Sequence, residues 1–309
     1  MTKLQRPSAH GARAVRFESA GHVMKLLTSV GYLADKRMCD VLWLADQLGK
    51  PILIEGPAGT GKTELAKSIA LVTDSRLIRL QCYEGLDEGR ALYEWNYQKQ
   101  LLRILADSVG ATDDVEAWSD LEPGIFTEAF LMTRPLLDAI RAEEPVVLLL
   151  DEVDRLDIEA EALLLEVLSD YQISIPELGT VTGNQIPTVF LTCNNSRDLS
   201  EALRRRCLYL HIDYPTPERE RDIVRTRVPG ISEDLAAQIT ALVASFRQSD
   251  VQRHQSKSPT LEWATTLLSL GAAELDAEFV AESRQILRCY RDGIDSAASH
   301  QPLRSESGI

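Results

Sequence analysis

A glycine-rich segment ending in lysine and threonine lies at residues 56–63, which read GPAGTGKT and directly follow the apolar run PILIE. The segment fits the pattern GxxxxGK[ST] where its chemistry requires it, after a predicted strand and before a predicted helix. Glycines let backbone N–H groups turn inward around phosphates, and the start of the next helix adds a favourable dipole. We expect Lys62 to reach the β- and γ-phosphates of a nucleotide and the Thr63 hydroxyl to ligate magnesium. A glycine turn that binds no nucleotide is the alternative.

Two adjacent carboxylates follow another apolar run, in PVVLLLDEVDR at 145–155. The end of a buried strand would place them beside the phosphate loop of a neighbouring parallel strand, where open α/β sheets bind ligands. Asp151 suits the magnesium shell, and Glu152 suits activation of the water that attacks the γ-phosphate. In the alternative interpretation, Glu152 only caps the following helix. The predicted cofactor-binding residues are Gly56, Pro57, Ala58, Gly59, Thr60, Gly61, Lys62, Thr63 and Asp151, with Thr63 and Asp151 as the metal ligands.

A third apolar run, PTVFLTCNNSRDL at 187–199, leads into two asparagines. A neutral amide at the end of this strand could hold the attacking water from the side opposite Glu152. Asn194 follows the strand directly, and we therefore predict this catalytic role for it. Asn195 could equally be a turn residue.

An arginine cluster at 204–206 lies in the segment LSEALRRRCLYLHIDYP. Arginine is planar, permanently charged and bidentate, so a cluster near a subunit edge can complete the site of a neighbouring subunit by contacting its γ-phosphate. A solvated basic face, or a salt bridge within this acidic protein, is the alternative for any one of the three residues.

Short apolar runs alternate with helical patterns from PILIE to PTVFLTCN, which predicts an α/β fold with a parallel sheet covered by helices on both faces. After YPTP at 214–217 the strand-like runs stop, and SEDLAAQITALVASF and AEFVAESRQILRCY have helical periodicity. Ahead of the sheet, the segment from Val23 predicts two short helices separated near Gly31. The expected organisation is a loose arm over 1–20, an α/β core over 21–214 with inserts near 83–125 and 171–187, a helical lid over 215–295, and a disordered tail over 296–309.

The chain has 309 residues and a formal charge of −14, and its five cysteines form no CxxC pair. The charge disfavours nucleic acid as a partner, and the cysteine spacing disfavours a zinc site or a disulfide framework. No stretch approaches the roughly 20 apolar residues of a membrane span, and the first residues lack a secretory signal. We therefore expect a cytoplasmic protein.

The ordered motifs GPAGTGKT, LLLDEVDR, TCNNSRDL and EALRRRC, followed by a helical segment, resemble those of AAA+ P-loop ATPases of the MoxR family over roughly residues 22–290. YLADKRMCDVLWLADQLGKPILIEGPAGTGKTELA, YEWNYQKQLL, ISIPELGT and CLYLHIDYP are similar to the branch associated with maturation of carbon monoxide dehydrogenase-type molybdenum enzymes. The resemblance implies Lys62 and Thr63 as Walker A, Asp151 and Glu152 as Walker B, and Asn194 as sensor 1. It places Arg205 and Arg206 at or beside the arginine finger.

The resemblance further implies ATP and Mg²⁺ as cofactors and a ring, usually a hexamer, with ATP between subunits. It implies a chaperone-like role on a client protein, with a partner that carries a von Willebrand factor A domain, in metal-centre assembly or enzyme activation. One position departs from the family pattern, because residues 258–260 read Ser-Pro-Thr where many members have Ser-Pro-Arg. Thr260 cannot supply the sensor 2 charge, so that Lys257, another arginine or a different lid mechanism must replace it.

Two segments could give this chain a function beyond ATP hydrolysis, by contacting a client protein. The segment from Tyr83 to about Ile125 is rich in aromatic residues, which either grip a polypeptide or pack the insert against the core. The segment YQISIPELGTVTGNQIP predicts a hairpin around Leu178 and Gly179 that could touch a client.

The sequence thus favours a ring ATPase that remodels a protein client. One alternative is a motor of the same fold that acts on nucleic acid, such as a clamp loader or a restriction-type NTPase. A second is a nucleotide-gated assembly scaffold in which hydrolysis is slow. Salt-sensitive DNA binding would favour the first alternative, and slow turnover with and without partner would favour the second.

Overall fold

The computed structural model describes residues 15–108, 124–183, 185–249 and 260–269. The chain divides into two compact units, Met1–Tyr214 and Pro215–Ile309. Strands and helices alternate in the first unit, whereas the described elements of the second are helices.

The first unit is built on a five-stranded sheet in the order β2-β5-β8-β1-β9 with every neighbouring pair parallel. Its strands are β1 (Ile52–Glu55), β2 (Arg76–Gln81), β5 (Val146–Asp151), β8 (Thr188–Cys193) and β9 (Leu208–His211). Every residue of β1, β5 and β8 is buried, as expected for strands covered on both faces. The predicted parallel sheet is therefore confirmed.

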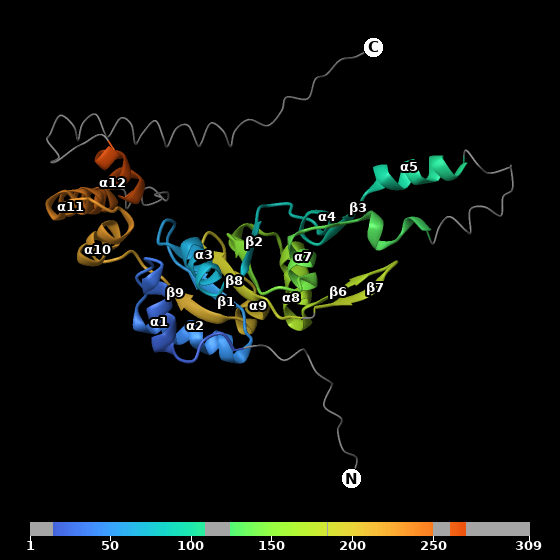
Figure 1. The fold of residues 1–309 in the computed structure, drawn as a ribbon, viewed down its shortest axis with the longest axis horizontal. Coiled ribbons are helices and arrows are strands. Elements are labelled where there is room, and N and C mark those ends of the chain that lie inside the picture. The colour runs from blue at the N-terminus through green and yellow to red at the C-terminus, as the bar shows by residue number, and fades with distance from the viewer. Residues whose placement is uncertain (1–14, 109–123, 184, 250–259, 270–309) are drawn as a thin grey trace, which may run out of the picture. The chain divides into compact units, whose positions relative to one another are not determined.

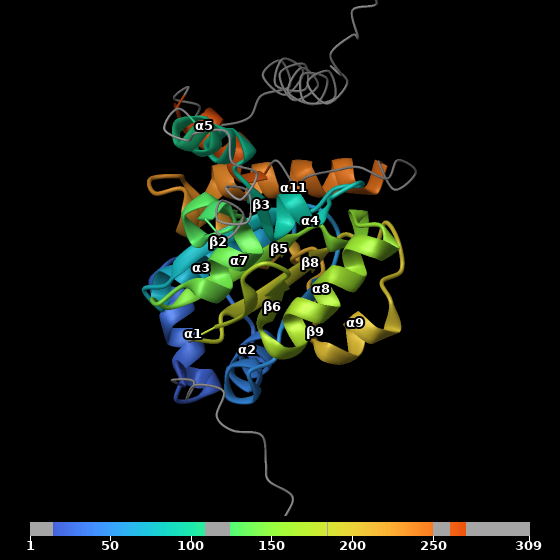
Figure 2. The same ribbon diagram turned by 90° about the vertical axis from the view of Figure 1, so that its right-hand side faces the viewer.

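Helices cover both faces of this sheet (Figures 1 and 2). One face packs on α1 (Ala20–Ser29), α2 (Lys36–Leu48) and α3 (Lys62–Val72). The other packs on α7 (Pro135–Arg141), α8 (Ile158–Asp170) and α9 (Glu201–Arg206). Because successive strand residues point to opposite faces, Ile54, Val147 and Phe190 belong to the α3 side, and Leu53, Leu148 and Leu191 belong to the α8 side.

The folded part of the chain begins before residue 21, which is earlier than the predicted loose arm over 1–20. Phe17 is buried, and its backbone N–H donates a hydrogen bond to the Asp46 carboxylate at 3.1 Å. Ser19 caps the N-terminus of α1 by accepting from the His22 N–H. The expected arm is therefore wrong for residues 17–20, and its residues 1–14 lie outside the described residues.

The aromatic segment forms a small extension of the core. It contains α4 (Glu88–Ala91), β3 (Tyr93–Trp95) and α5 (Tyr97–Ser108), and it is followed by the 3₁₀ turn η1 (Glu128–Phe130) and by β4 (Leu131–Thr133), which pairs antiparallel with β3. Trp95 is buried and makes an edge contact with Phe126 at 5.3 Å between ring centroids, so it packs the core rather than gripping a polypeptide. Tyr97 on α5 is 65% exposed, and Trp118 lies outside the described residues.

The predicted hairpin before β8 is also present. Strands β6 (Gln172–Ile175) and β7 (Gly179–Thr182) pair antiparallel, with Ile175 opposite Gly179. Gly179 has φ +81°, a conformation that side chains other than glycine rarely adopt.

The second unit contains α10 (Pro217–Arg227), α11 (Glu233–Ser249) and α12 (Thr260–Ser269). Its core includes Leu235 and Ile239 of α11 and Trp263 of α12, which agrees with the helical periodicity predicted for SEDLAAQITALVASF. The predicted helix at 277–290 and the predicted tail lie outside the described residues.

Candidate functional site

The glycine loop connects β1 to α3, as the sequence predicts. Gly56 passes so close to the chain after β9 that a Cβ atom there would lie 2.0 Å from the Ile212 carbonyl oxygen. Gly59 has φ +82° and Gly61 has φ +90°, and Gly61 is the residue that precedes the first turn of α3. The glycines are therefore required by packing and by backbone conformation, and the loop ends at a helix N-terminus suited to an anion.

Lys62, the first residue of α3, is 6% exposed. Its Nζ donates hydrogen bonds to the Gly56 and Pro57 carbonyl oxygens, both at 2.7 Å, so the ammonium group lies against the loop. Burial lowers the pKa of this lysine, and the neighbouring carboxylates Asp154 and Asp151 act in the opposite direction. A partly desolvated ammonium bound by neutral carbonyl groups suits a phosphate, whose charge would offset the cost of burial.

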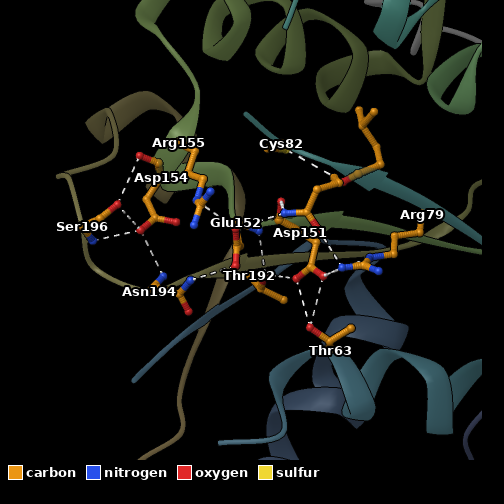
Figure 3. A network of polar contacts seen from close by, with 12 residues as sticks. Thr63, Arg79, Cys82, Asp151, Glu152, Asp154, Arg155, Thr192, Asn194 and Ser196 are labelled. Carbon is orange, nitrogen blue, oxygen red and sulfur yellow. Dashed lines mark hydrogen bonds and ion pairs between the residues drawn. The ribbon is translucent and has the colours of Figure 1, made fainter. Parts of the chain in front are cut away.

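Thr63 and Asp151 meet across the sheet edge, as Figure 3 shows. The Thr63 hydroxyl is 3.0 Å from Asp151 Oδ1 and 3.2 Å from Oδ2, and Asp151 is 4% exposed. A hydroxyl and a carboxylate are hard oxygen ligands, and Mg²⁺ takes one or two such protein ligands together with phosphates and waters. The two side chains thus fit magnesium held jointly with a nucleotide.

Glu152 has the left-handed backbone conformation, with φ 61°, which costs a non-glycine residue about 1 kcal/mol or more. It precedes the 3₁₀ turn η2 (Val153–Arg155), but its side chain makes no capping hydrogen bond. The carboxylate instead contacts Arg155 at 2.8 Å, Gln81 at 3.1 Å and Asn194 at 3.4 Å. The alternative in which Glu152 only caps a helix is therefore wrong.

The two asparagines after β8 have different roles in the structure. Asn194 Nδ2 faces Glu152 Oε1, whereas Asn195 has φ 60° and its backbone N–H donates to Cys193 Sγ at 3.3 Å. Asn195 is a turn residue, and Asn194 is the one that faces the carboxylate pair (Figure 3).

Several polar residues of this network were not predicted from the sequence. Arg79 and Thr192 both donate hydrogen bonds to the Asp151 carboxylate. Buried Asp154 accepts from the backbone N–H groups of Asn194 and Ser196, and so ties the loop after β8 to the end of β5. These residues could have been found as polar side chains within otherwise apolar strands. Arg79 and Gln81 alternate in RLIRLQC, and Thr192 lies near the end of TVFLTC.

The three arginines of α9 have different environments. Arg204 contacts the buried carboxylate of Glu55 at 3.3 Å, within the same chain. Arg205 pairs with Glu201 one helical turn away and is 74% exposed, while Arg206 donates to Ser169 Oγ at 2.9 Å. Arg204 is therefore engaged inside its own subunit, and Arg205 and Arg206 lie at the end of α9.

Thr260, at the position that the family resemblance associates with sensor 2, is the first residue of α12 and is 3% exposed. Its hydroxyl donates to buried Glu220 at 2.6 Å within the helical unit. Thr260 is thus a packing residue of that unit, and Lys257, Ser258 and Pro259 lie outside the described residues.

The cysteines Cys39, Cys82, Cys193 and Cys207 are buried and free. Burial raises the pKa of Cys82 to about 12 and that of Cys193 to about 11, which keeps these thiols neutral. Within the described ranges, no group of three or more His, Cys, Asp or Glu residues could hold a metal ion. Nor does any helix among those residues have the length and apolar character needed to cross a membrane.

A parallel sheet with a glycine loop after β1, an acidic pair after β5 and a polar residue after β8 defines a P-loop nucleotide-binding fold of the AAA+ type. Residues 52–214 match the ATPase family associated with various cellular activities (AAA), and the chain belongs to this family.

Individual proteins that this chain is similar to share 26% sequence identity with it or less. The chain is 26% identical over 185 residues to uncharacterized proteins of Staphylococcus aureus strains USA300 and NCTC 8325, covering 58% of this chain and 61% of each relative. It therefore spans about three fifths of the length of these curated relatives. Among solved structures, the Thermotoga maritima RuvB Holliday junction branch migration motor is 18% identical, with a TM-score of 0.47, covering 88% of this chain and 73% of that one. A point mutant of the same RuvB protein has a TM-score of 0.48 at 18% identity, covering 88% of this chain and 74% of that chain.

Proposed function

We propose that this protein is a MoxR-type AAA+ ATPase that couples ATP hydrolysis to the remodelling of a client protein. The observation that carries the proposal is the convergence at one sheet edge of the Thr63–Asp151 contact, at 3.0 Å, with Glu152 and Asn194 beside it. Residues from three separate segments supply the groups that phosphoryl transfer to water requires: phosphate binding, a metal ligand pair and a base.

The loop Gly56–Gly61 and Lys62 would bind the phosphates of ATP. The Lys62 ammonium donates to loop carbonyls at 2.7 Å, and it would exchange these partners for phosphate oxygens. Thr63 and Asp151 would hold Mg²⁺, which supplies neutralisation of the phosphate charge and alignment of the phosphoryl group.

Glu152 would accept the proton of the attacking water, and Asn194 would orient that water from the neighbouring strand. The Asn194 amide already approaches the Glu152 carboxylate at 3.4 Å. Arg155 also contacts Glu152 at 2.8 Å, and it is an exposed side chain that can move away. A carboxylate held by exchangeable partners can change orientation when nucleotide arrives.

Arg205 and Arg206 would act on the site of a neighbouring subunit in a ring of six. Both residues lie at the end of the exposed helix α9, whereas Arg204 pairs with Glu55 of its own chain. This arrangement supports a role for Arg205 or Arg206, rather than Arg204, in contacting a neighbouring subunit. Buried Thr260 supports a mechanism without a sensor 2 arginine at that position.

The client assignment rests on the MoxR resemblance of the segments 32–66, 93–102, 173–180 and 207–215. We propose a cytoplasmic metalloenzyme as client, activated by metal or cofactor insertion together with a partner that carries a von Willebrand factor A domain. The formal charge of −14 supports a protein client over nucleic acid.

The test is Glu152→Gln, which preserves size and polarity but removes the base. We expect ATP affinity to remain within about threefold and turnover to fall about 100-fold or more, since a general base contributes at least that much. Glu159→Gln, at an exposed position of α8, is the matched control and should hydrolyse ATP like the wild type. Undiminished hydrolysis by Glu152→Gln would refute the catalytic assignment.

The same variant tests the client assignment. Glu152→Gln loaded with ATP should retain its client, so affinity capture from the native host followed by mass spectrometry identifies it. Recovery of a von Willebrand A-domain protein with an immature metalloenzyme supports the proposal. Recovery of nuclease or replication subunits with DNA contradicts it.

A further inference from the structure

Arg79 contacts the proposed metal ligand Asp151 from the neighbouring strand. Its Nε lies 3.0 Å and its terminal nitrogen 2.6 Å from Asp151 Oδ2 (Figure 3). Strands β2 and β5 are in register so that Arg79 is opposite Leu149 and Gln81 is opposite Asp151. Alternate residues share a face, so Arg79 and Gln81 lie on the α3 side of the sheet, where Thr63 lies.

Asp151 has hydrogen-bond donors besides Arg79. The Thr192 hydroxyl donates to Asp151 Oδ1, and the Thr63 hydroxyl donates to the same oxygen at 3.0 Å. These two neutral donors and the buried strand backbone hold the carboxylate, and the Thr63 hydroxyl also lies 3.2 Å from Oδ2. What Arg79 adds is charge, since it is the cation paired with a carboxylate whose side chain is only 5% exposed.

Arg79 can also leave Asp151 at little cost. Its side chain is 48% exposed, and its terminal nitrogen also donates to Gln81 Oε1 at 2.6 Å. A guanidinium group that moves away from Asp151 therefore keeps one hydrogen bond and gains water, and no buried unpaired charge is created when a metal ion takes its place.

We propose that Arg79 is a tethered counter-cation that competes with magnesium for the Asp151 carboxylate and thereby sets the free Mg²⁺ concentration that nucleotide binding requires. This inference rests on the proposed function, because it concerns the same metal site. Two cations that share one carboxylate repel each other, so Mg²⁺ binding must weaken the Arg79 contact, and Arg79 must weaken Mg²⁺ binding by the same amount.

Arg79 acts through Asp151 and does not contact the nucleotide in this proposal, so its test is a binding measurement. The full-length protein is titrated with free Mg²⁺ at a fixed concentration of a fluorescent, slowly hydrolysed ATP analogue, and the half-saturating Mg²⁺ concentration is recorded. For Arg79→Gln we expect this concentration to fall about three- to tenfold, a modest effect because water screens a half-exposed arginine. Arg79→Lys keeps the positive charge near Asp151, which is the property that the proposal concerns, and should stay within about twofold of the wild type.

Arg76→Gln is the matched control. Arg76 lies on the same strand and pairs with Asp138 at 3.0 Å, and its exposure is comparable at 42%. This variant loses a β2 arginine and its ion pairs with Asp138 and Glu144 without touching Asp151, so the half-saturating Mg²⁺ concentration should not change. Arg79→Met provides a second neutral variant if Arg79→Gln folds poorly, and thermal unfolding reports on the fold of each.

Three outcomes would overturn the inference. If Arg79→Gln binds the analogue but needs the same Mg²⁺ concentration as the wild type, the competition does not exist. If it needs more Mg²⁺, Arg79 orients the ligand instead of competing with the metal, and the inference is wrong. If wild-type protein binds no analogue at any Mg²⁺ concentration, the proposed function itself fails, and this inference fails with it.

Discussion

Two buried carboxylates, Asp151 and Glu55, end strands β5 and β1 at the same edge of the sheet, with β8 between them, and their side chains lie on opposite faces. Asp151 ends β5 and faces α3, where it meets Thr63, and Glu55 ends β1 and faces α9, where it meets Arg204. They are 4% and 5% exposed, respectively. Their partners differ, because the Asp151 oxygens accept hydrogen bonds from Thr63, Thr192 and Arg79, whereas buried Glu55 Oε1 has an ion-pair contact and no hydrogen bond.

The difference separates a carboxylate suited to ligands from one suited to structure. Asp151 is paired with an arginine that is half exposed and can give way to a metal ion, and it faces Thr63, the second proposed metal ligand. Glu55 contacts Arg204, which brings α9 against the end of β1 immediately before the phosphate loop, and the Tyr209 side chain of β9. Burial alone therefore does not identify the functional carboxylate, and the chemistry of its partners does.

The largest effect expected from this comparison is on Asp151. Asp151→Asn keeps acceptors for Thr63 and Thr192 but removes the charge, so we expect Mg²⁺-dependent ATP binding to weaken about 100-fold. The free energy of unfolding should change by less than about 1 kcal/mol, since an isosteric amide leaves the packing intact. Calorimetric titration and urea unfolding measure the two quantities. A large loss of stability with unchanged binding would reverse the two roles.

Arg204→Gln tests the structural role of the Glu55–Arg204 ion pair. It leaves the Glu55 carboxylate buried without its cation, and we expect a loss of about 2 kcal/mol in the free energy of unfolding. This figure is below that of a fully buried pair because Arg204 is 42% exposed. ATP affinity of the folded protein should stay within about threefold. Adding Glu55→Gln should restore most of the stability, and no recovery in the double variant would contradict a direct ion pair.

The smallest expected effect is the pH dependence of ATP affinity, which depends on Lys62. The charge of Asp151 acts against burial and raises the pKa of this lysine, so the two residues belong to the same site. The pKa of Lys62 lies below 10.5 in the free protein because of burial, and bound phosphates should raise it. Binding then takes up protons as the pH rises toward the lowered pKa, so ATP affinity should fall a few-fold as the pH rises through that pKa, which lies below 10.5. Calorimetry in buffers of different ionisation heat measures the protons taken up. Proton release on binding would contradict the prediction.

The sequence predicted the sheet and the main site residues because their signals are local. Near-continuous aliphatic runs in β1, β5 and β8 indicate strands buried on both faces, and a polar residue at the end of each run indicates the ligand edge. It favoured Asn194 over Asn195 because Asn194 follows the strand directly, and the structure adds the reason, a left-handed turn at Asn195 that leaves Asn194 facing Glu152.

The sequence by itself thus determined the family, the phosphate loop and the choice of carboxylates, through the GPAGTGKT segment and the DE and NN pairs. These features can be predicted because glycine conformation and strand burial depend on short stretches of sequence. Only the tertiary structure brought Arg79 onto Asp151, 72 residues away, and divided the arginines of α9 between Glu55 and the surface. The physical reason is that a long charged side chain has no local preference for one partner. Its partner is set by strand order and helix packing, which bring distant segments together.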